Sequence, residues 1–513
     1  MIDFKNIATV ATYERKTLFR SWFFRIFALV TLFVMFMVNM GLFGHSYANW
    51  AGRAVPANIP YANVLIVSVA QAIIAVFLSS DFLKRDKKLD TTEVIYARPI
   101  SNGEYVVGKT AGIMSLFLAL LLVVLLMALT FNLIIKDTPV VWEAYLLYPL
   151  LVTIPTLIFI LGLSFFLMIL LKNQAVTFIV LLGYIGLALF YFKDRLDGLL
   201  DYMAFNFPMV YSDFIGFGDT SSILVHRLCY LLLGLGFIFG TIRFLSRLPQ
   251  TGKWNFINLF GFVFFLAAGM AVGYKYYDSH QDSYARGNRY LAMNNAYAHM
   301  PVPDVSSNDL KVVQKDHGLV ISSSLRIRNT MGSTLDTLLF SLNPGFIVDS
   351  ISDSNGPVKW ERKEQLVLIM PEKGLSPWRG TSLRIDYHGV PDRAVAYLDI
   401  TRKERSSLKN VNLMKFDKFA GIVDPEYVLL TSEMIWYPVA GVGFNRTDFL
   451  SSVPDFARFS IEVQPRPGLT ALCPGLSEPG DSVFRFRPEQ ELNSLPLVIG
   501  PLEKHSKIGR AHV

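Results

Sequence analysis

Hydrophobic residues are distributed unevenly along this chain. Up to Tyr277 they occur in long uninterrupted runs, whereas beyond it polar and apolar positions are mixed as in a soluble domain. A hydrocarbon core about 30 Å thick is crossed by roughly 20 apolar residues in a helix. Seven segments reach or nearly reach that length and are predicted to be membrane helices: Phe23–Phe43, Tyr61–Ser80, Ala111–Ile135, Tyr145–Leu171, Gln174–Phe192, Arg227–Leu245 and Phe256–Tyr274.

Strict alternation of apolar and polar residues marks the second part of the chain. Leu325 and Ile327 alternate with arginines, and the same period of two recurs in Leu383–Tyr387 and Phe459–Val463. This periodicity predicts half-buried antiparallel strands. Turn sequences rich in Pro and Gly separate the runs. We therefore predict an all-β region from about Asp316 onward.

The basic residues indicate how the membrane part is oriented. Residues 278–513 contain 27 basic and 27 acidic residues, so the net charge of +7 lies in the membrane part. With the N-terminus inside, the loops on the cytoplasmic side hold fourteen Lys and Arg against four on the other side, in agreement with the positive-inside rule. We expect a multi-pass protein of the bacterial inner membrane with a periplasmic C-terminal domain. Because the basic residues flank apolar spans, lipid is the expected environment and nucleic acid is not an expected partner.

The predicted spans carry no Asp, Glu, Lys, Arg or His near their middle. Charges at the bilayer centre usually mark an ion or proton route, so their absence argues against a proton-coupled transporter. The sequence also contains no G-x-x-x-x-G-K-[ST] phosphate loop. A transporter of this kind therefore needs an ATPase on a separate chain, and we expect no cofactor in this chain itself.

Two segments predicted on the cytoplasmic side have distinctive sequences. Residues 1–22 place apolar residues at helical spacing and predict an amphipathic helix in the membrane interface. The loop after the second span runs from Asp81 to Lys109. It contains a Thr-x-Glu stretch, a Pro-Ile-Ser turn and a Gly-Lys pair before the third span, and this combination resembles the first cytoplasmic loop of ABC-2 type ABC transporter permeases.

The ABC-2 resemblance covers roughly the first half of the chain. It implies a six-helix permease that works as a homo- or heterodimer with an ABC ATPase subunit, on which the N-terminal helix and the loop dock. The residues that match the family's loop, and so are the candidate ATPase-coupling residues, are Thr92, Glu93, Pro99, Gly108 and Lys109. The alternative interpretation of this stretch is a solvated charged loop.

Several phrases of the β region resemble the N-terminal β-saddle domain of the aminopeptidase N family of zinc peptidases. They are Leu325–Asn329, Phe340–Gly345, Leu383–Gly389, Phe459–Leu472 and Leu497–Leu502. Permeases fused to such a peptidase are known from Bacteroidota, and the order of the two parts here matches that fusion. By this resemblance, Glu433 matches the β-domain acid that contacts a substrate amine. The alternative for Glu433 is an ordinary surface glutamate.

The zinc peptidase chemistry is missing from this chain. None of the eight histidines is part of a His-Glu-x-x-His motif. We therefore expect no catalytic residue and no metal site, and we interpret the chain as a fragment truncated before the catalytic domain. The resemblance implies that the full-length protein carries that domain with its zinc. The final residues, Ile508–Val513, match what a common sequencing adapter encodes when translated.

The predicted organisation has six parts. They are a cytoplasmic interfacial helix (1–22), a six-span permease domain (23–248), a seventh span (249–277), a linker or short helix (278–307), an extracytoplasmic β domain (308–505) and an artefactual tail (506–513). Three functions stay open at this point: an ABC export permease, a membrane-anchored zinc aminopeptidase fragment whose β domain binds peptides, and a binding module outside the membrane. Seven spans exceed what a membrane tether needs, and this favours the permease.

Overall fold

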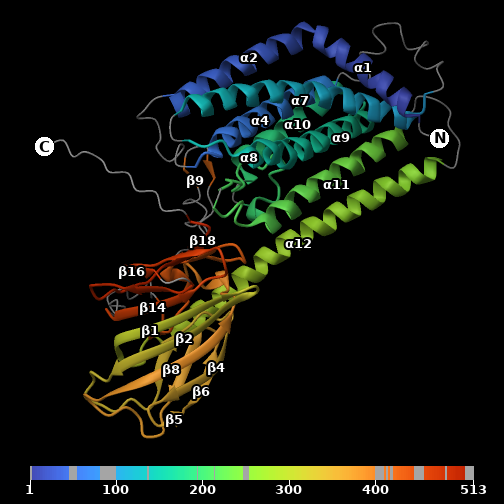
Figure 1. Cartoon of the computed structure of the whole chain (residues 1–513). Helices are drawn as coiled ribbons and strands as arrows, with labels where there is room; N and C mark the ends of the chain where they lie inside the picture. Colours follow the sequence, from blue (N-terminus) through green and yellow to red (C-terminus); the bar gives the residue numbers. More distant parts are fainter. Residues whose placement is uncertain are drawn as a thin grey trace. The chain divides into compact units, whose positions relative to one another are not determined.

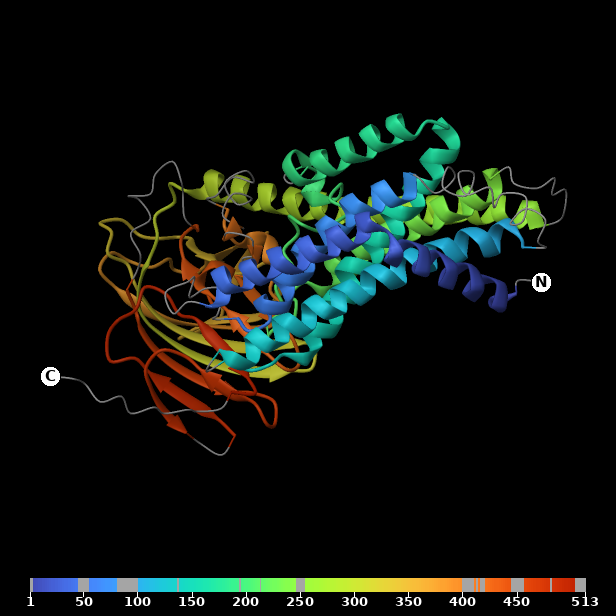
Figure 2. The ribbon, with the colours of Figure 1, turned by 90° about the horizontal axis from the view of Figure 1, so that it is seen from above.

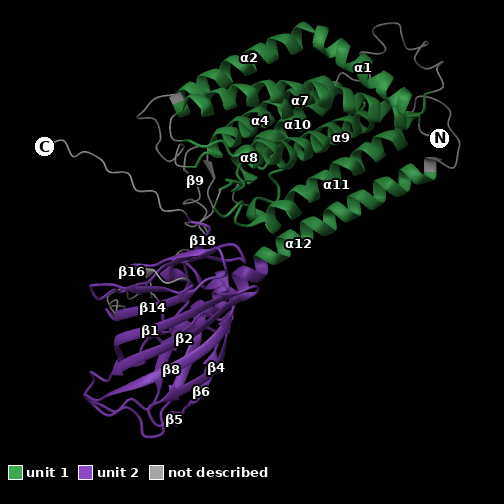
Figure 3. Cartoon of the chain, in the orientation of Figure 1, with its two compact units in different colours: residues 1–280, 406–417 green, residues 281–405, 418–513 purple. Residues whose placement is uncertain are grey.

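The computed structural model describes residues 3–44, 55–80, 100–135, 138–192, 195–212, 214–245, 254–398, 410–411, 414–415, 420–443, 456–479 and 482–502. These residues form two compact units (Figure 3). Unit 1 consists of residues 1–280 and 406–417, and unit 2 consists of residues 281–405 and 418–513. Each unit is described by itself below.

Unit 1 is a bundle of helices (Figure 1). Its elements are α1 (Phe4–Arg20), α2 (Trp22–Asn39), the π-helix η1 (Met40–Gly44), α4 (Asn58–Ser80), α7 (Asn102–Ile134), α8 (Trp142–Tyr148), the π-helix η2 (Pro149–Thr153), α9 (Ile154–Leu171), α10 (Gln174–Phe190), the 3₁₀ helix η4 (Leu196–Gly198), α11 (Thr220–Phe244), most of α12 (Trp254–Tyr297), and the short strands β9 (Asn410–Val411) and β10 (Met414–Lys415).

The described part of unit 1 supports the prediction of a membrane protein. Six helical stretches in the described residues are long and apolar enough to span a membrane, and they coincide with six of the seven predicted segments. The remaining predicted segment forms α10, an apolar helix of 17 residues. At 1.5 Å per residue its length is about 26 Å, somewhat less than the roughly 30 Å of a hydrocarbon core.

Two of these helices extend beyond the predicted segments. Helix α7 has 33 residues and begins at Asn102, because Ser101 and Glu104 form a capping box that fixes its first turn. Its length of about 50 Å exceeds the hydrocarbon core, so its first turns are available for contacts outside it. Helix α12 has 44 residues. Residues 278–297, predicted to form a linker or short helix, continue this helix.

Unit 2 is built mainly from β-strands. Its elements are the end of α12, β1 (Asp304–Lys315), β2 (Gly318–Arg328), β3 (Leu338–Ser341), β4 (Phe346–Asp353), β5 (Gly356–Pro357), β6 (Lys359–Lys363), β7 (Leu366–Met370), β8 (Gly380–Gly389), the 3₁₀ helix η5 (Arg393–Val395), β11 (Gly421–Val423), β12 (Val428–Leu430), the 3₁₀ helix η6 (Ser432–Met434), β13 (Val439–Ala440), β14 (Arg458–Gln464), β15 (Thr470–Leu472), β16 (Leu476–Pro479), β17 (Phe484–Arg487) and β18 (Leu497–Gly500). The three sheets have the orders β16-β17-β14-β1-β2-β8-β4-β5, β11-β12-β18-β15 and β13-β3-β7-β6.

The predicted alternation is confirmed in the large sheet. Leu325 and Ile327 in β2 are buried and the arginines beside them are exposed, and β8 and β14 follow the same pattern. The β region begins earlier than predicted, because β1 starts at Asp304 and pairs with β2 over its length. β1 was missed because its buried face includes Asn308, whose side chain accepts a hydrogen bond of 2.8 Å from the Ser323 hydroxyl.

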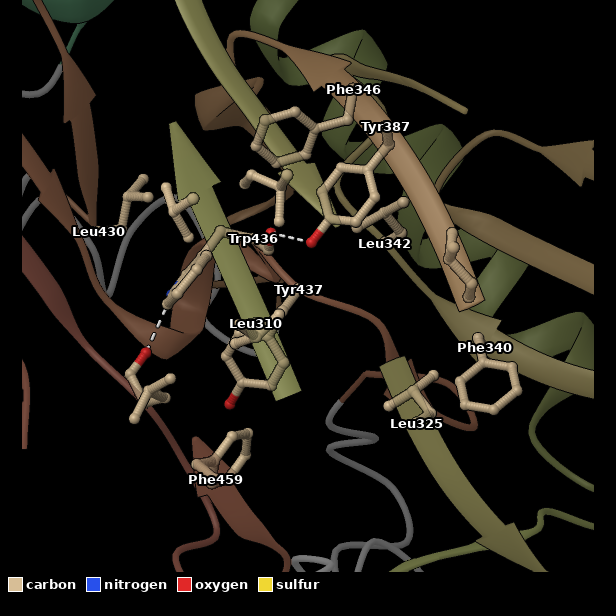
Figure 4. Packing of buried hydrophobic residues seen from close by; sticks show 14 of the residues in the cluster. Leu310, Leu325, Phe340, Leu342, Phe346, Tyr387, Leu430, Trp436, Tyr437 and Phe459 are labelled. Carbon is tan, nitrogen blue, oxygen red and sulfur yellow. Dashed lines mark hydrogen bonds between the residues drawn. The ribbon is translucent and has the colours of Figure 1, made fainter. Parts of the chain in front are cut away.

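The core of unit 2 lies between the sheets, where large buried aromatic residues meet (Figure 4). The Tyr387 hydroxyl donates to Trp436 O at 3.1 Å, and Trp436 Nε1 donates to Leu495 O at 2.9 Å. The buried hydroxyl of Tyr387 and the buried indole N–H of Trp436 therefore both have hydrogen-bond acceptors, as buried polar groups require. The other face of the β13-β3-β7-β6 sheet packs Leu339 and its neighbours against residues near the end of α12, including Met293.

Candidate functional site

The first candidate site is the contact between α1 and the beginning of α7, which lie side by side in both views (Figures 1 and 2). Helix α1 is amphipathic as predicted: Glu14 and Leu18 are buried, whereas Lys16 and Arg20 are exposed. Asp3 caps its first turn by accepting from Lys5 N at 2.8 Å. The helix thus keeps a basic face exposed while its other face contacts α7.

Two glycines of α7 allow the backbones of α1 and α7 to approach closely. A Cβ added at Gly108 would lie 2.7 Å from Val10 Cβ and 3.0 Å from Ile7 O, and one at Gly112 would lie 2.8 Å from Ala11 O. Only glycine allows the two helix backbones to approach this far, as in the small-x-x-x-small pattern of membrane helices. The predicted residue Gly108 therefore lies in the contact. Gly112 was missed, although its spacing of four residues from Gly108 was a readable signal.

A buried ion pair lies in the same contact. Lys109 Nζ is 3.5 Å from Glu14 Oε2, and the two side chains are 3% and 2% exposed. The Lys109 ammonium also lies 5.1 Å from the centre of the Tyr105 ring. Removing one member of a buried pair leaves an uncompensated charge, which typically costs about 3–5 kcal/mol. The predicted residue Lys109 thus connects α7 to α1.

Glu104 joins the start of both helices. One oxygen of its carboxylate, Oε1, accepts from Asp3 N at 2.8 Å, and the other, Oε2, accepts from Ser101 N at 2.9 Å and from Asn6 Nδ2 at 3.3 Å. The capping box of α7 therefore also holds the N-terminus of α1. The contacts of Glu104 and the pair of Lys109 with Glu14 thus join the first turns of α7 to two places along α1.

The other predicted site residues do not join this contact. Thr92, Glu93 and Pro99 lie outside the described residues. Glu433 lies in η6 of unit 2, where its side chain is exposed.

The second candidate site is centred on Arg227, which was predicted to be the first residue of the sixth span. Helix α11 begins at Thr220, seven residues before the predicted start at Arg227, because Asp219 caps it by accepting from Ser222 N at 3.2 Å. His226 and Arg227 therefore lie about two turns inside the helix. Their exposed fractions are 0% and 2%.

Arg227 contacts two segments through backbone carbonyls and a third through a hydroxyl. Its Nε donates to Leu151 O at 2.6 Å and its Nη1 donates to Tyr202 O at 2.8 Å. Its Nη2 donates to Val152 O at 3.1 Å and to the Thr156 hydroxyl at 2.9 Å. The guanidinium thus connects α11 to the junction of η2 with α9 and to the chain between α10 and α11.

One of the carbonyls that Arg227 contacts, Leu151 O, lies where the helix is irregular. Pro155 has no N–H, so Leu151 O cannot receive the usual bond from the residue four positions later. In η2, Ile154 N donates to Pro149 O, five positions earlier, instead of to a carbonyl four positions away. Such π-turns are frequent at functional sites. Asp201, which is completely buried, interacts electrostatically with Arg227.

We compared the described residues with the requirements of a zinc site. Among them, no group of three or more His, Cys, Asp and Glu side chains lies close enough together to hold a metal ion.

Comparison with known proteins gives a partial likeness to solved peptidase structures. No family model and no curated protein matches the chain. The M1 zinc metallopeptidase from Deinococcus radiodurans is 18% identical over 39% of this chain and 43% of that one, with a TM-score of 0.30. The native yeast LTA4 hydrolase is 12% identical over 40% of this chain and 30% of that one, with a TM-score of 0.28. The chain spans less than half the length of these structures, and TM-scores near 0.3 do not establish a common fold.

Proposed function

We propose that this chain is the permease subunit of an ABC exporter, acting with a separate ATPase subunit and carrying a β domain outside the cytoplasm. The observation that carries the proposal is the junction of α1 with the first turns of α7, closed by Gly108, Gly112 and the buried pair of Glu14 with Lys109. The junction directly follows the loop that resembles the ATPase-docking loop of ABC-2 permeases.

The junction supports a simple mechanical step. When the ATPase subunit closes on ATP, it displaces the exposed basic face of α1 and the loop that precedes α7. Because α1 is fixed to α7 by close backbone packing and by a buried ion pair, the displacement passes into α7. A long helix that spans the membrane then tilts as a unit. The energy comes from the partner, in agreement with the lack of a phosphate loop in this sequence.

The apolar character of the spans suits a lipid-like or hydrophobic cargo. The predicted dimer of permeases and the predicted position of unit 2 outside the cytoplasm belong to the same proposal.

The proposal is tested by co-purification with nucleotide-binding subunits, followed by an ATPase assay in lipid nanodiscs. We expect a stable complex whose ATPase activity depends on the permease. Glu14→Lys breaks the buried ion pair between α1 and α7. It should therefore lower the permease-dependent ATPase activity about tenfold or more. The exchange of both charges, Glu14→Lys with Lys109→Glu, should restore part of it. Glu93→Ala should weaken the complex itself.

The controls separate coupling from folding. Lys311→Ala removes an exposed charge from β1, away from α1 and α7, and should leave the permease-dependent ATPase activity unchanged. If no nucleotide-binding subunit binds the chain and Glu93→Ala has no effect, the chain is not an ABC permease. A tethered peptidase fragment would show that result, because it needs no ATPase.

A further inference from the structure

Unit 2 contains a pocket at the edge where two of its sheets end. Residues of β4 and the turn before it form one side, and β6 with the turn after it forms the other. The volume of about 320 Å³ is at the lower end of the range of ligand pockets, about 300–1,000 Å³. The lining residues used below are Phe346, Ile347, Trp360, Arg362 and Glu364.

The strands beside the pocket lie at the ends of their sheets: β6 is the last strand of its sheet and β4 is the last but one. On one side β4 pairs with β8. On the other side it pairs with the short strand β5, but only through Ser352 and Asp353. β6 pairs with β7 and is the last strand of the β13-β3-β7-β6 sheet. Within the described residues, the first part of β4, Phe346–Ser350, therefore has an edge without a pairing strand. Such an edge presents backbone donors and acceptors that another backbone pairs with.

The pocket is bordered by a fixed arginine. Arg362 Nη2 donates to Leu342 O at 2.9 Å and to Asn343 O at 2.7 Å, and its Nε donates to Glu364 O at 2.7 Å. Its Nη1 is buried and has no hydrogen-bond partner among the described residues. Burial lowers the pKa of Arg362 to about 10, so the group is charged at neutral pH. A buried donor of this kind favours an incoming oxygen.

The wall formed by the turn before β4 is rigid. Asn343 Nδ2 donates to Met434 O at 2.7 Å, and Asn343 Oδ1 accepts from Gly345 N at 2.9 Å. A Cβ added at Gly345 would lie 2.1 Å from Val390 O, so only glycine fits this close approach. A site that is formed before binding loses less entropy when a ligand arrives.

Apolar side chains complete the surface. Ile347, on the edge of β4, is 63% exposed. Trp360 is partly buried and packs against the core of unit 2. An exposed apolar residue on an unpaired strand edge favours association with another strand, and natural edges normally carry charges at such positions.

We propose that this edge binds an extended polypeptide segment that pairs as an additional strand with Phe346–Ser350. One apolar side chain of the segment enters the pocket against Trp360, and one of its carbonyl oxygens accepts from Arg362 Nη1. Pairing of backbones supplies affinity and the pocket supplies selectivity, as in other cases of strand addition. The inference concerns unit 2 alone and does not depend on the proposed transport function.

The test uses the full chain in nanodiscs without an ATPase subunit, so its failure is distinct from a failure of transport. The probe is a fluorescent hexapeptide in which leucine and threonine alternate, with blocked ends. Its twin carries a methyl group on every backbone nitrogen, which removes the donors for strand pairing and keeps the side chains. We expect saturable binding of the first peptide and binding at least about tenfold weaker for the twin, equivalent to one lost hydrogen bond.

Variants locate the site. Ile347→Lys changes an exposed side chain and should weaken binding about tenfold without altering the melting temperature. Arg362→Gln should weaken binding to a similar extent. The matched control is Leu476→Lys, which introduces the same charge at a 68% exposed position of β16, the opposite edge of the same sheet, and should leave binding unchanged.

Three results would overturn the proposal. They are the absence of saturable binding, equal affinities for the peptide and its methylated twin, and equal losses for Ile347→Lys and Leu476→Lys. Equal affinities would mean that the pocket takes only a side chain or a small molecule. A photoreactive benzophenone on the peptide gives an independent readout, because it should label residues 344–364, and labelling confined to other residues would contradict the site.

Discussion

At the residue scale, the bundle of unit 1 holds two buried cations in different ways. Lys109 faces an anionic partner, Glu14, at 3.5 Å. Arg227 instead donates to three backbone carbonyls and to the Thr156 hydroxyl. A planar guanidinium suits the second task because it presents several donors in a fixed geometry, whereas an ammonium is a point charge.

Gly108 is predicted to be required for the contact of α1 with α7. Gly108→Ala should lower the melting temperature of the purified chain by several degrees, because the added methyl overlaps with Val10. Gly183→Ala in α10 is the matched control, since a Cβ there has no atom within 4 Å. That control should be neutral or slightly stabilising, because alanine favours helix. Equal melting temperatures for the two variants would contradict the close packing.

Arg227 is predicted to stabilise the bundle. Arg227→Met leaves Leu151 O, Val152 O and Tyr202 O without this donor and should reduce the free energy of unfolding by about 3 kcal/mol or more. Arg227→Lys should recover only part of the loss. Arg195→Met, which changes an exposed arginine, should have a small effect. Denaturant unfolding in detergent measures all three, and an equal effect at the two arginines would show that the carbonyl contacts are unimportant.

At the scale of elements, the irregular junction of η2 and α9 and the position of Arg227 depend on each other. Pro155 removes the donor that Leu151 O would otherwise receive, and Arg227 Nε replaces it at 2.6 Å. The two features therefore form one unit of structure, contributed by two helices far apart in sequence.

A double-mutant cycle tests this dependence. Pro155→Ala supplies an N–H that is able to bond Leu151 O within the helix. Arg227→Met should consequently cost less in the Pro155→Ala background than in the natural chain, by about 1 kcal/mol. Additive effects of the two substitutions would show that the proline and the arginine act independently.

The end of α12 is a second element held by specific contacts, all within unit 2. Asp392 Oδ2 accepts from Arg286 Nε at 3.0 Å and from the Tyr290 hydroxyl at 2.8 Å. Gln365 Nε2 donates to Tyr290 O at 2.7 Å and to Asn294 Oδ1 at 2.8 Å. These contacts account for a continuous helix in the segment predicted as a linker or short helix, because the sheet beside these residues satisfies their polar groups.

Asp392→Ala should loosen this helix end. We expect faster amide hydrogen exchange over residues 286–297 of α12, because the variant removes the acceptor for Arg286 and Tyr290. Asp282→Ala is the control: Asp282 also pairs with Arg286, but its side chain is 60% exposed, and exposed pairs contribute little. Similar exchange rates in the two variants would contradict the importance of Asp392.

At the scale of the whole molecule, the sequence predicts the local patterns well and the non-local partners poorly. Long apolar runs and the alternation at Leu325 and Ile327 report burial directly, so six helices and several strands were placed correctly. Gly108 and Lys109 were identified from a resemblance, without their contact to α1. The partners of Arg227 lie up to 76 residues away, and no local pattern encodes them. The earlier start of α11 was readable from the cap at Asp219.

The number of membrane crossings decides the central claim. Seven crossings would place α1 and unit 2 on opposite sides of the membrane, as the proposed ATPase-driven permease with an outer β domain requires. The segment that makes the count odd is α10, the shortest of the apolar helices, with 17 residues. If α10 did not cross the membrane, both parts would face the same compartment.

The most direct measurement is cysteine labelling in intact cells with a membrane-impermeant maleimide. Single cysteines at two exposed positions, Arg15→Cys in α1 and Lys311→Cys in β1, are compared in a background that lacks Cys229 and Cys473. The account predicts that Lys311→Cys reacts in intact cells and that Arg15→Cys reacts only after permeabilisation. Reaction of both cysteines under the same condition would contradict it.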